Sequence, residues 1–310
     1  MSRFSAITLD LSRFPPPLAL GELSLEDVLA ARIARAEEVF AERGLPWNVK
    51  RSSHDTVVAL QRVDNWRELL VRGDVNDAVK AGLIAFATGT DLDHQGLTAA
   101  LNLPRGMRDL MLRREMVPAS GSTPAVMESD AEYRRRLLLS PEAAAAGTEG
   151  GYLFHALSAD TRVVNADVWT PERGEAVVAL QARAGLAAAP IDVIAAVHAH
   201  LHRKDVKPLT DAITVRSVTT HGYRIAVVVY VQPGPDPLAV KALVEDSLSA
   251  MALARRLPGR DVPMSAIIAA ATAGPVDRVV LADPLADVVM QRGQLAVCEG
   301  ISVEVRSHDG

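Results

Sequence analysis

The amino-acid sequence predicts an α+β fold in which an N-terminal helical region is followed by repeated small α/β units of split-βαβ character. Residues 24–101 place apolar side chains at helical spacing and contain no candidate strand. From residue 162 onward, stretches of alternating apolar residues are separated by shorter helical stretches. Residues 102–128 hold several prolines and glycines, so we predict a helical region with a linker over residues 1–122 and two or three α/β units over residues 123–310.

The helical region is predicted to contain two long helices and one short one. Ser24 is a suitable N-cap for the first helix, which should end at Gly44. The second helical stretch runs from about residue 55 to residue 86, and Gly73 is where we expect any bend. Asp91 is the expected cap of the short third helix.

The apolar stripes of these helices predict contact with another chain. A stretch of about thirty residues at helical period is long for a helix inside a compact domain. Residues 24–101 also offer no strand against which the stripes could pack. Stripes of this kind usually contact a partner. The candidate interface residues are Leu25, Leu29, Val63, Trp66, Leu70, Val79 and Leu83.

A further helix is predicted just after the linker. Ser129 can cap it while Glu132 reaches back to close a capping box, and Pro141 should end it. Residues 134–136 are three successive arginines, which point to different sides of a helix and cannot form one cluster. We therefore expect this helix to be solvated or to face a partner.

A glycine-rich elbow leads from this helix into the α/β region. Gly147, Gly150 and Gly151 can turn the chain through conformations that other residues avoid. A short helix over residues 152–158 should follow, and then a strand over residues 162–169.

The α/β region repeats an order of strand, strand and helix. Within it, the strand over residues 223–231 is apolar on both faces, which predicts a central strand covered on both sides. The predicted elements are a hairpin over 162–181 that turns at 170–174, a helix over 191–203, strands over 211–219 and 222–232, a helix over 238–257, a helix over 265–271, and strands over 276–281 and 300–306.

Composition limits the possible partners. The 310 residues include 33 basic and 38 acidic side chains, and the formal charge of -5 argues against a nucleic-acid-binding role. The single cysteine, Cys298, cannot form an internal disulfide. No apolar run reaches the roughly 20 residues that a membrane helix needs. These features predict a soluble protein that is not inserted in a membrane and folds in a reducing cytoplasm.

Two groups of side chains raise the alternative of a metal-dependent enzyme. His198 and His202 lie one helical turn apart, the spacing of a metal-binding pair, although no glutamate lies between them as in zinc proteases. Asp91, Asp93 and His94 form a second group. We expect a helix end and a helix cap at these places, with no catalytic residue, cofactor or metal.

Seven motifs in a fixed order resemble one known family. The segment from residue 123 to 168 combines ESDAEYRRR, a glycine-rich turn and HALSAD before a strand. In this order and spacing the chain resembles the baseplate assembly protein J family of contractile-tailed phages, although residues 103–118 are richer in Met and Arg than that family's pattern. The motifs are DLS (10–12), ATGTDLDH (87–94), TPAVMESD (123–130), KPLTDAITV (207–215), YVQPGPDP (230–237), GRDVPMSAI (259–267) and VDRVVLADPLADVV (276–289).

The resemblance implies a structural protein of a tail baseplate wedge and no enzyme activity. It implies that the N-terminal helices enter a bundle with an I-type tail protein, while the later units contact neighbouring J-type chains and other hub and wedge proteins. It also implies a place in the virion tail after assembly in the bacterial cytoplasm, and a rearrangement when the sheath contracts. A fragment that starts near Glu128 is expected to fold alone without binding the I-type partner.

Overall fold

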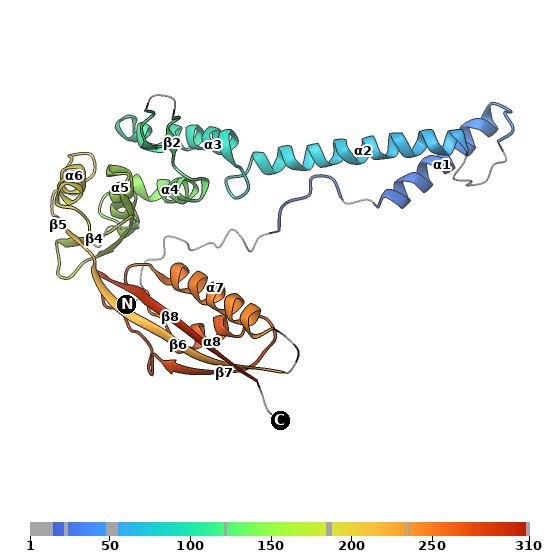
Figure 1. The fold of residues 1–310 in the computed structure, drawn as a ribbon. Helices are drawn as coiled ribbons and strands as arrows, with labels where there is room; N and C mark the ends of the chain where they lie inside the picture. The colour runs from blue at the N-terminus through green and yellow to red at the C-terminus, as the bar shows by residue number, and fades with distance from the viewer. Residues whose placement is uncertain are drawn as a thin grey trace.

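The computed structural model describes residues 15–21, 24–47, 55–120, 123–183, 188–232, 234 and 236–307. A pair of helices projects from a body that contains the other helices and two main sheets (Figure 1). The α+β fold class and the N-terminal helical region are confirmed. DLS at residues 10–12, the first motif of the family resemblance, lies outside the described residues.

The projecting pair consists of α1 (Leu25–Glu42) and α2 (Thr56–Ala81), which we call the arm. The Ser24 hydroxyl accepts a hydrogen bond from the Asp27 amide at the start of α1, as predicted. Its predicted end is also confirmed, since Gly44 adopts a φ of 67° after the last turn. α2 runs through Gly73 without interruption and ends at Ala81, five residues before the predicted end.

The two helices of the arm pack on each other through a small apolar contact. Val28 and Ile33 of α1 and Val58 of α2 are buried there. Fully buried Asn65 donates a hydrogen bond of 2.7 Å to the Leu25 carbonyl. Because α1 has 18 residues and α2 has 26, part of α2 extends beyond its neighbour (Figure 1).

The first part of the body, residues 89–159, consists of helices and two short strands. Two predictions are wrong in this region. Asp91 lies in the first turn of its helix, where Thr88 occupies the N-cap position. Pro141 does not end its helix, which continues to Ala143. Proline has no amide hydrogen to donate to the Leu137 carbonyl, and the Ser140 hydroxyl donates to that carbonyl instead. The elements are α3 (Gly89–Leu101), η2 (Arg105–Met111), β1 (Glu115–Val117), β2 (Val126–Met127), α4 (Asp130–Ala143) and α5 (Glu149–Ala159).

Two of the three elbow glycines are needed for different reasons. Gly147 adopts a φ of 84°, which favours glycine. Gly151 lies inside the first turn of α5, where a Cβ would lie 2.9 Å from the Thr148 hydroxyl and 3.0 Å from the Ala145 and Glu142 carbonyl oxygens. The elbow therefore brings α4 and α5 closer than any side chain would allow.

The first sheet has the strand order β3-β4-β5. β3 (Val163–Trp169) and β4 (Glu175–Ala182) form the predicted antiparallel hairpin. After α6 (Ile191–Leu201) the chain returns as β5 (Ala212–Ser217), which pairs parallel to β4. β4, α6 and β5 thus form a β-α-β unit in which the two parallel strands are direct neighbours, with no strand between them.

The second sheet has the order β7-β6-β8 and contains the predicted central strand. β6 pairs antiparallel with one neighbour and parallel with the other. Only its odd-numbered face is buried, from Tyr223 to Val231, so the prediction that both faces are covered is wrong for this chain. The elements are β6 (Thr219–Val231), α7 (Pro237–Arg255), α8 (Met264–Ala271), β7 (Val276–Asp283) and β8 (Gln294–Ser307).

The predicted repeat of strand, strand and helix is also wrong in its pairing. β5 and β6 were expected to belong to one unit, but they lie in different sheets. The single residue between them, Val218, donates its amide to the Leu180 carbonyl, so the chain passes directly from one sheet to the next without a hairpin turn. The described residues therefore form two α/β units with different connectivity.

Two main hydrophobic cores lie on either side of this crossing. The first joins Leu92 and Met111 to Tyr133, Phe154 and residues of the first sheet, so it includes side chains from both sides of residue 122. The second lies between β6, α7 and α8. The division of the chain at residue 122 stays a prediction, but residues 87–111 share a core with residues that follow it.

The joint between the two α/β units combines a small apolar cluster with a buried ion pair. Ala179, Val218 and Leu295 form its apolar centre. Buried Asp167 pairs with Arg292 at 2.8 Å and accepts a hydrogen bond of 2.7 Å from the Gly293 amide.

Candidate partner-binding surface

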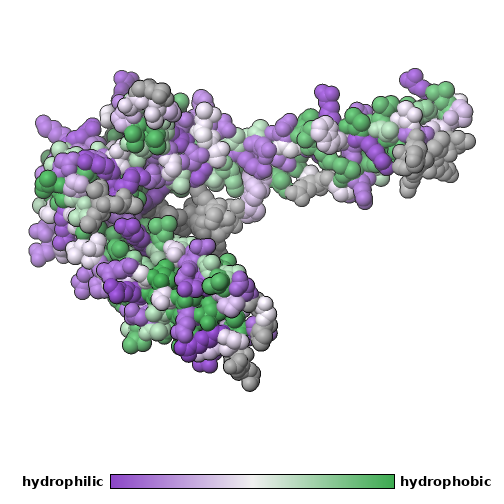
Figure 2. All heavy atoms as spheres, viewed as in Figure 1, coloured by the Kyte–Doolittle hydropathy of each residue, from purple (hydrophilic) through white to green (hydrophobic). Residues whose placement is uncertain are grey.

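The predicted interface residues of α2 form an exposed stripe on the arm. Apolar side chains are visible along the arm in Figure 2. Val63 is 64% exposed, Trp66 60% and Leu70 47%, and spacings of three and four residues place them on one face of α2. Val63 and Leu70 lie roughly 140–160° around the helix from Asn65, which is buried against α1. The stripe therefore faces away from α1.

The other predicted residues do not join this stripe. Leu25 lies on α1 and is exposed, while Leu29 is half-buried. Val79 is exposed on the last turns of α2, and exposed Leu83 follows the end of that helix. The structure thus brings together three of the seven residues, and their role as an interface stays a prediction.

Asp93, one of the two acidic residues proposed for a metal-dependent enzyme, is already engaged in an ion pair. Asp93 pairs with Arg113 at 2.6 Å, and the same guanidinium pairs with Asp130 at 2.7 Å. The pKa of the Asp130 carboxyl is lowered by its bond with Arg113 and by the Gly89 amide. The first turn of α3 is therefore tied to the first turn of α4 by one arginine.

The histidines of α6 do not converge on a point where a metal ion could bind. The rings of His198 and His202 stack with their centroids 3.9 Å apart. The Nδ1 atom of His202 lies 2.8 Å from the His198 carbonyl oxygen, so it serves as a donor to the backbone. In the described part of the chain, no three histidine, cysteine, aspartate or glutamate side chains are grouped closely enough to hold a metal.

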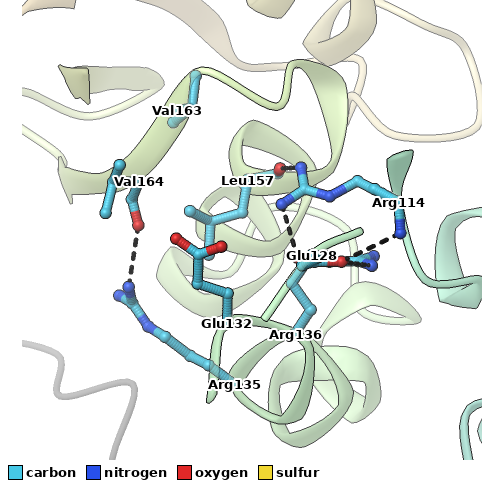
Figure 3. A pocket seen from close by; sticks show the side chains of 8 residues that line it. All are labelled: Arg114, Glu128, Glu132, Arg135, Arg136, Leu157, Val163 and Val164. Carbon is cyan, nitrogen blue, oxygen red and sulfur yellow. Dashed lines mark hydrogen bonds and ion pairs between the residues drawn. The ribbon is translucent and has the colours of Figure 1, made fainter. Parts of the chain in front are cut away.

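A buried charged cluster lies between β1, α4 and α5 (Figure 3). The Glu128 side chain is fully buried and pairs with Arg114 at 2.7 Å and with Arg136 at 2.5 Å. Arg114 also donates to the Leu157 carbonyl, and Arg136 donates to the Leu110 and Leu112 carbonyls. The cavity beside them measures about 20 Å³, which is room for one water molecule.

This cluster corrects the expectation that the arginines at 134–136 face solvent or a partner. Arg134 donates to the Ile84 and Ala87 carbonyls, and Arg135 donates to the Val164 carbonyl and the Asn165 side chain. The three side chains do point to different sides of α4. Each of them reaches an acceptor in another part of the same chain, so all three arginines serve the fold.

Burial and pairing act in opposite directions on the ionisation of Glu128. Burial alone would raise the pKa of its carboxyl, but hydrogen bonds from Arg136 and Arg114 outweigh it and hold the pKa below its usual value. Burial lowers the pKa of Arg114. The carboxylate is therefore needed to stabilise two guanidinium groups that are largely removed from water.

A second buried polar contact joins α5 to α6. His155 is 3% exposed, and its Nδ1 atom lies 3.3 Å from Nε2 of His200. Burial, and the second imidazole beside it, lower the pKa of His155 to about 4. No sequence pattern pointed to this pair, because its two residues are 45 positions apart.

Comparison with known proteins identifies the family. Residues 54–109 match the model of the Baseplate J-like N-terminal domain, and residues 223–304 match that of the Baseplate J-like protein C-terminal domain. Over 297 residues the chain is 34% identical to baseplate protein J of Escherichia phage P2. This alignment covers 94% of this chain and 95% of the phage P2 protein. The first match spans α2 to η2 and the second spans most of the second sheet. The chain therefore belongs to the baseplate J-like family.

Proposed function

We propose that this protein is a structural component of a contractile-tail baseplate wedge. The observation that carries this proposal is the similarity to baseplate protein J of phage P2 along nearly the whole of both chains. A role in assembly also suits the arm, which exposes large apolar side chains far from the body (Figures 1 and 2). Exposed apolar surface of this kind marks interaction sites in folded proteins.

The arm is the part that we propose binds an I-type tail protein. With 26 residues, α2 is about 39 Å long, and the stripe formed by Val63, Trp66 and Leu70 faces away from α1. A third helix laid along this stripe would bury the stripe in a three-helix bundle. Arg32, Glu68 and Arg72 pair with one another on the α1 side of the arm and hold the two helices together before the partner arrives.

The α/β units are proposed to contact neighbouring copies of this chain and other hub and wedge proteins. Ring closure around the central hub, and the rearrangement at sheath contraction, need interfaces with two packings that differ by a few kcal/mol. The protein would then be part of the virion tail baseplate, made and assembled in the bacterial cytoplasm. No helix among the described residues is long and apolar enough to cross a membrane.

Among the described residues, nothing in the geometry favours the alternative of a metal-dependent enzyme. Asp93 is bound to Arg113, and the ring of His202 is turned to a backbone carbonyl. A non-enzymatic role is therefore proposed, with no cofactor. Changing His198 and His202 together to alanine should leave metal content and assembly unaltered, and a stoichiometric metal lost in this double variant would contradict the structural role.

Variants of the arm test its role directly. The full chain is co-expressed with the adjacent tail proteins and captured by affinity tag. Trp66→Asp should reduce the amount of I-type protein captured about tenfold or more, because a charge would lie at the centre of the stripe. The melting temperature should stay near that of the wild type, since Trp66 is 60% exposed. Leu209→Asp is the matched control, because Leu209 is fully exposed between α6 and β5.

A truncation provides the second test, and the structure changes where it should begin. A fragment that starts at Glu128 lacks Leu92 and Met111, which belong to the first core, so we no longer expect it to fold alone. A fragment over residues 83–310 removes only the arm and the residues before it. It should fold and fail to bind the I-type protein. Undiminished binding would place the wedge contact in the body.

A further inference from the structure

The chain passes from the first α/β unit to the second without a loop. β5 belongs to the first sheet and β6 to the second, and Val218 is the residue between them (Figure 1). The Val218 amide donates to the Leu180 carbonyl of the first unit, whereas the Thr219 amide donates to the Gly293 carbonyl of the second unit. The backbone therefore changes from one unit to the other at a single residue, and a rotation there would turn one unit against the other.

The apolar contact across the joint is small. Ala179, Val218 and Leu295 are its buried residues, and half-buried Trp169 and Val297 pack against them. Each of the two main cores contains many more buried residues than this. Units of one chain that share only a small interface normally move relative to each other.

One turn of the second unit supplies the polar part of the contact. Arg292 and Gly293 lie just before β8 begins, and they meet the end of β3. Buried Asp167 pairs with Arg292 at 2.8 Å and accepts a hydrogen bond of 2.7 Å from the Gly293 amide. In the described structure, both partners of this carboxylate belong to the second unit. The buried position of Asp167 therefore depends on the closed joint.

Gly293 fits against the first unit because it has no side chain. A Cβ at this position would lie 3.0 Å from Nη2 of Arg216 and 3.0 Å from Cη2 of Trp169. The Arg216 guanidinium lies over the Trp169 ring at 5.1 Å from its centroid, and both side chains belong to the first unit. Gly293 also adopts a φ of 74°. A larger residue here would hold the two units apart even if it adopted the same backbone angle.

Closure of the joint also buries polar atoms that it leaves unpaired. The Gln181 side-chain nitrogen donates to the Arg256 carbonyl across the joint at 3.1 Å. Oε1 of Gln181 and Nε of Arg256 are buried and have no hydrogen-bond partner in the described structure. Buried polar atoms without partners oppose the arrangement that buries them, because water bonds to them once they are exposed. The joint therefore contains contacts that favour closure and groups that oppose it.

We propose that the joint is a conformational device with two positions. The closed position is the one described above, held by the contacts of Asp167 and Gly293, and the open position is reached by rotation at Val218. The inference deepens the proposed baseplate role, because units that contact different neighbours would change their relative orientation when the sheath contracts. The movement belongs to the isolated chain, so it is testable without a baseplate.

Distances between two spin labels, measured by pulsed electron paramagnetic resonance, test the movement in the full chain. Cys298→Ala removes the native thiol. Ile191→Cys on α6 and Leu238→Cys on α7 then place one label on each unit, at positions that are 81% and 76% exposed. This chain should give one main distance, with the open position in about 0.1–10% of molecules. Gly293→Asn should make a second distance the main one, because asparagine tolerates a positive φ but its Cβ does not fit against the first unit.

Gly44→Asn is the matched control for the loss of a glycine with positive φ. Gly44 has a φ of 67°, and nothing lies within 4 Å of the position that its Cβ would take. This control should leave the distance unchanged. Asp167→Asn keeps the shape of the side chain and removes its charge, so it should raise the population of the second distance about tenfold. Asp167→Asn decides the question if Gly293→Asn does not fold. An unchanged single distance in the folded variants would overturn the inference.

Maps of extended and contracted particles test the link with contraction. The contact between Asp167 and Gly293 should be present in one state and absent in the other. Its presence in both states would overturn the link, even if the isolated chain opens. The baseplate role is judged separately: it stands wherever this chain is part of the particle, and absence of the chain would contradict that role without changing the result with spin labels.

Discussion

Removal of the Glu128 charge should be the most damaging conservative substitution in the first core. Glu128→Gln keeps the shape of the side chain and leaves Arg114 and Arg136 without a counter-charge in a site where the carboxylate is fully buried. Loss of one partner of a buried ion pair costs about 3–5 kcal/mol. At roughly 2–4 °C per kcal/mol for a protein somewhat smaller than this one, the melting temperature should fall by about 6–20 °C.

The pH dependence of stability gives a second signature of the same group. The pKa of the Glu128 carboxyl in the folded protein lies below its ordinary value of 4.5, so the contribution of this group to stability is complete above about pH 4.5 and is lost as the pH falls through the folded pKa. Wild-type stability should therefore decline in acid more steeply than that of Glu128→Gln. Urea unfolding followed by circular dichroism between pH 3 and pH 7 measures both effects.

The control for this experiment is Glu38→Gln on α1. Glu38 pairs with Arg35 at 2.8 Å, but both side chains are more than 60% exposed. Such surface pairs contribute little to stability. The control should unfold as the wild type does. A loss of less than about 1 kcal/mol in Glu128→Gln would refute the argument that the cluster depends on this carboxylate.

Three further predictions follow from single contacts. Val227→Asp should be insoluble or unfold the second sheet, because Val227 is 2% exposed and an unpaired carboxylate there costs several kcal/mol. A normal melting curve would show that the odd-numbered face of β6 is open to solvent. Between about pH 6.5 and pH 4, His155 is neutral in the folded protein and binds a proton when the chain unfolds, so wild-type stability should fall as the pH falls through that window. His155→Gln should flatten this dependence of stability on pH. Gly151→Ala should destabilise the α4–α5 elbow by about 1–3 kcal/mol in urea unfolding, because the new methyl group would lie 2.9 Å from the Thr148 hydroxyl, and unchanged stability would show that the elbow can relax.

Local features of the fold were predictable because their causes lie within a few residues. Ser24 and Ser129 both cap the helices expected of them, since a cap bonds to an amide three residues away. The β3–β4 hairpin follows from alternation on both sides of a turn that ends in Gly174, whose φ is 81°. The same reasoning predicted β6 as the central strand of its sheet.

Features that depend on distant partners were not predictable. The direct crossing from β5 to β6 at Val218 has no local signal that separates it from a hairpin. The sequence pattern predicted no hydrogen-bond partners within the chain for Arg134 and Arg136, because their acceptors lie in segments that the pattern does not connect to α4. The second face of β6 was predicted to be covered from its apolar residues, and the chain itself does not cover it.

This protein is a structural baseplate component, and we propose that its arm enters a helical bundle with a partner. Cryo-electron microscopy of particles purified from the complete tail-gene cluster tests it most directly. We expect this chain in a ring at the baseplate end of the tail, with α2 packed against helices of another protein along Val63, Trp66 and Leu70. Absence of the chain from intact particles, or density in which this stripe of α2 faces solvent, would contradict it.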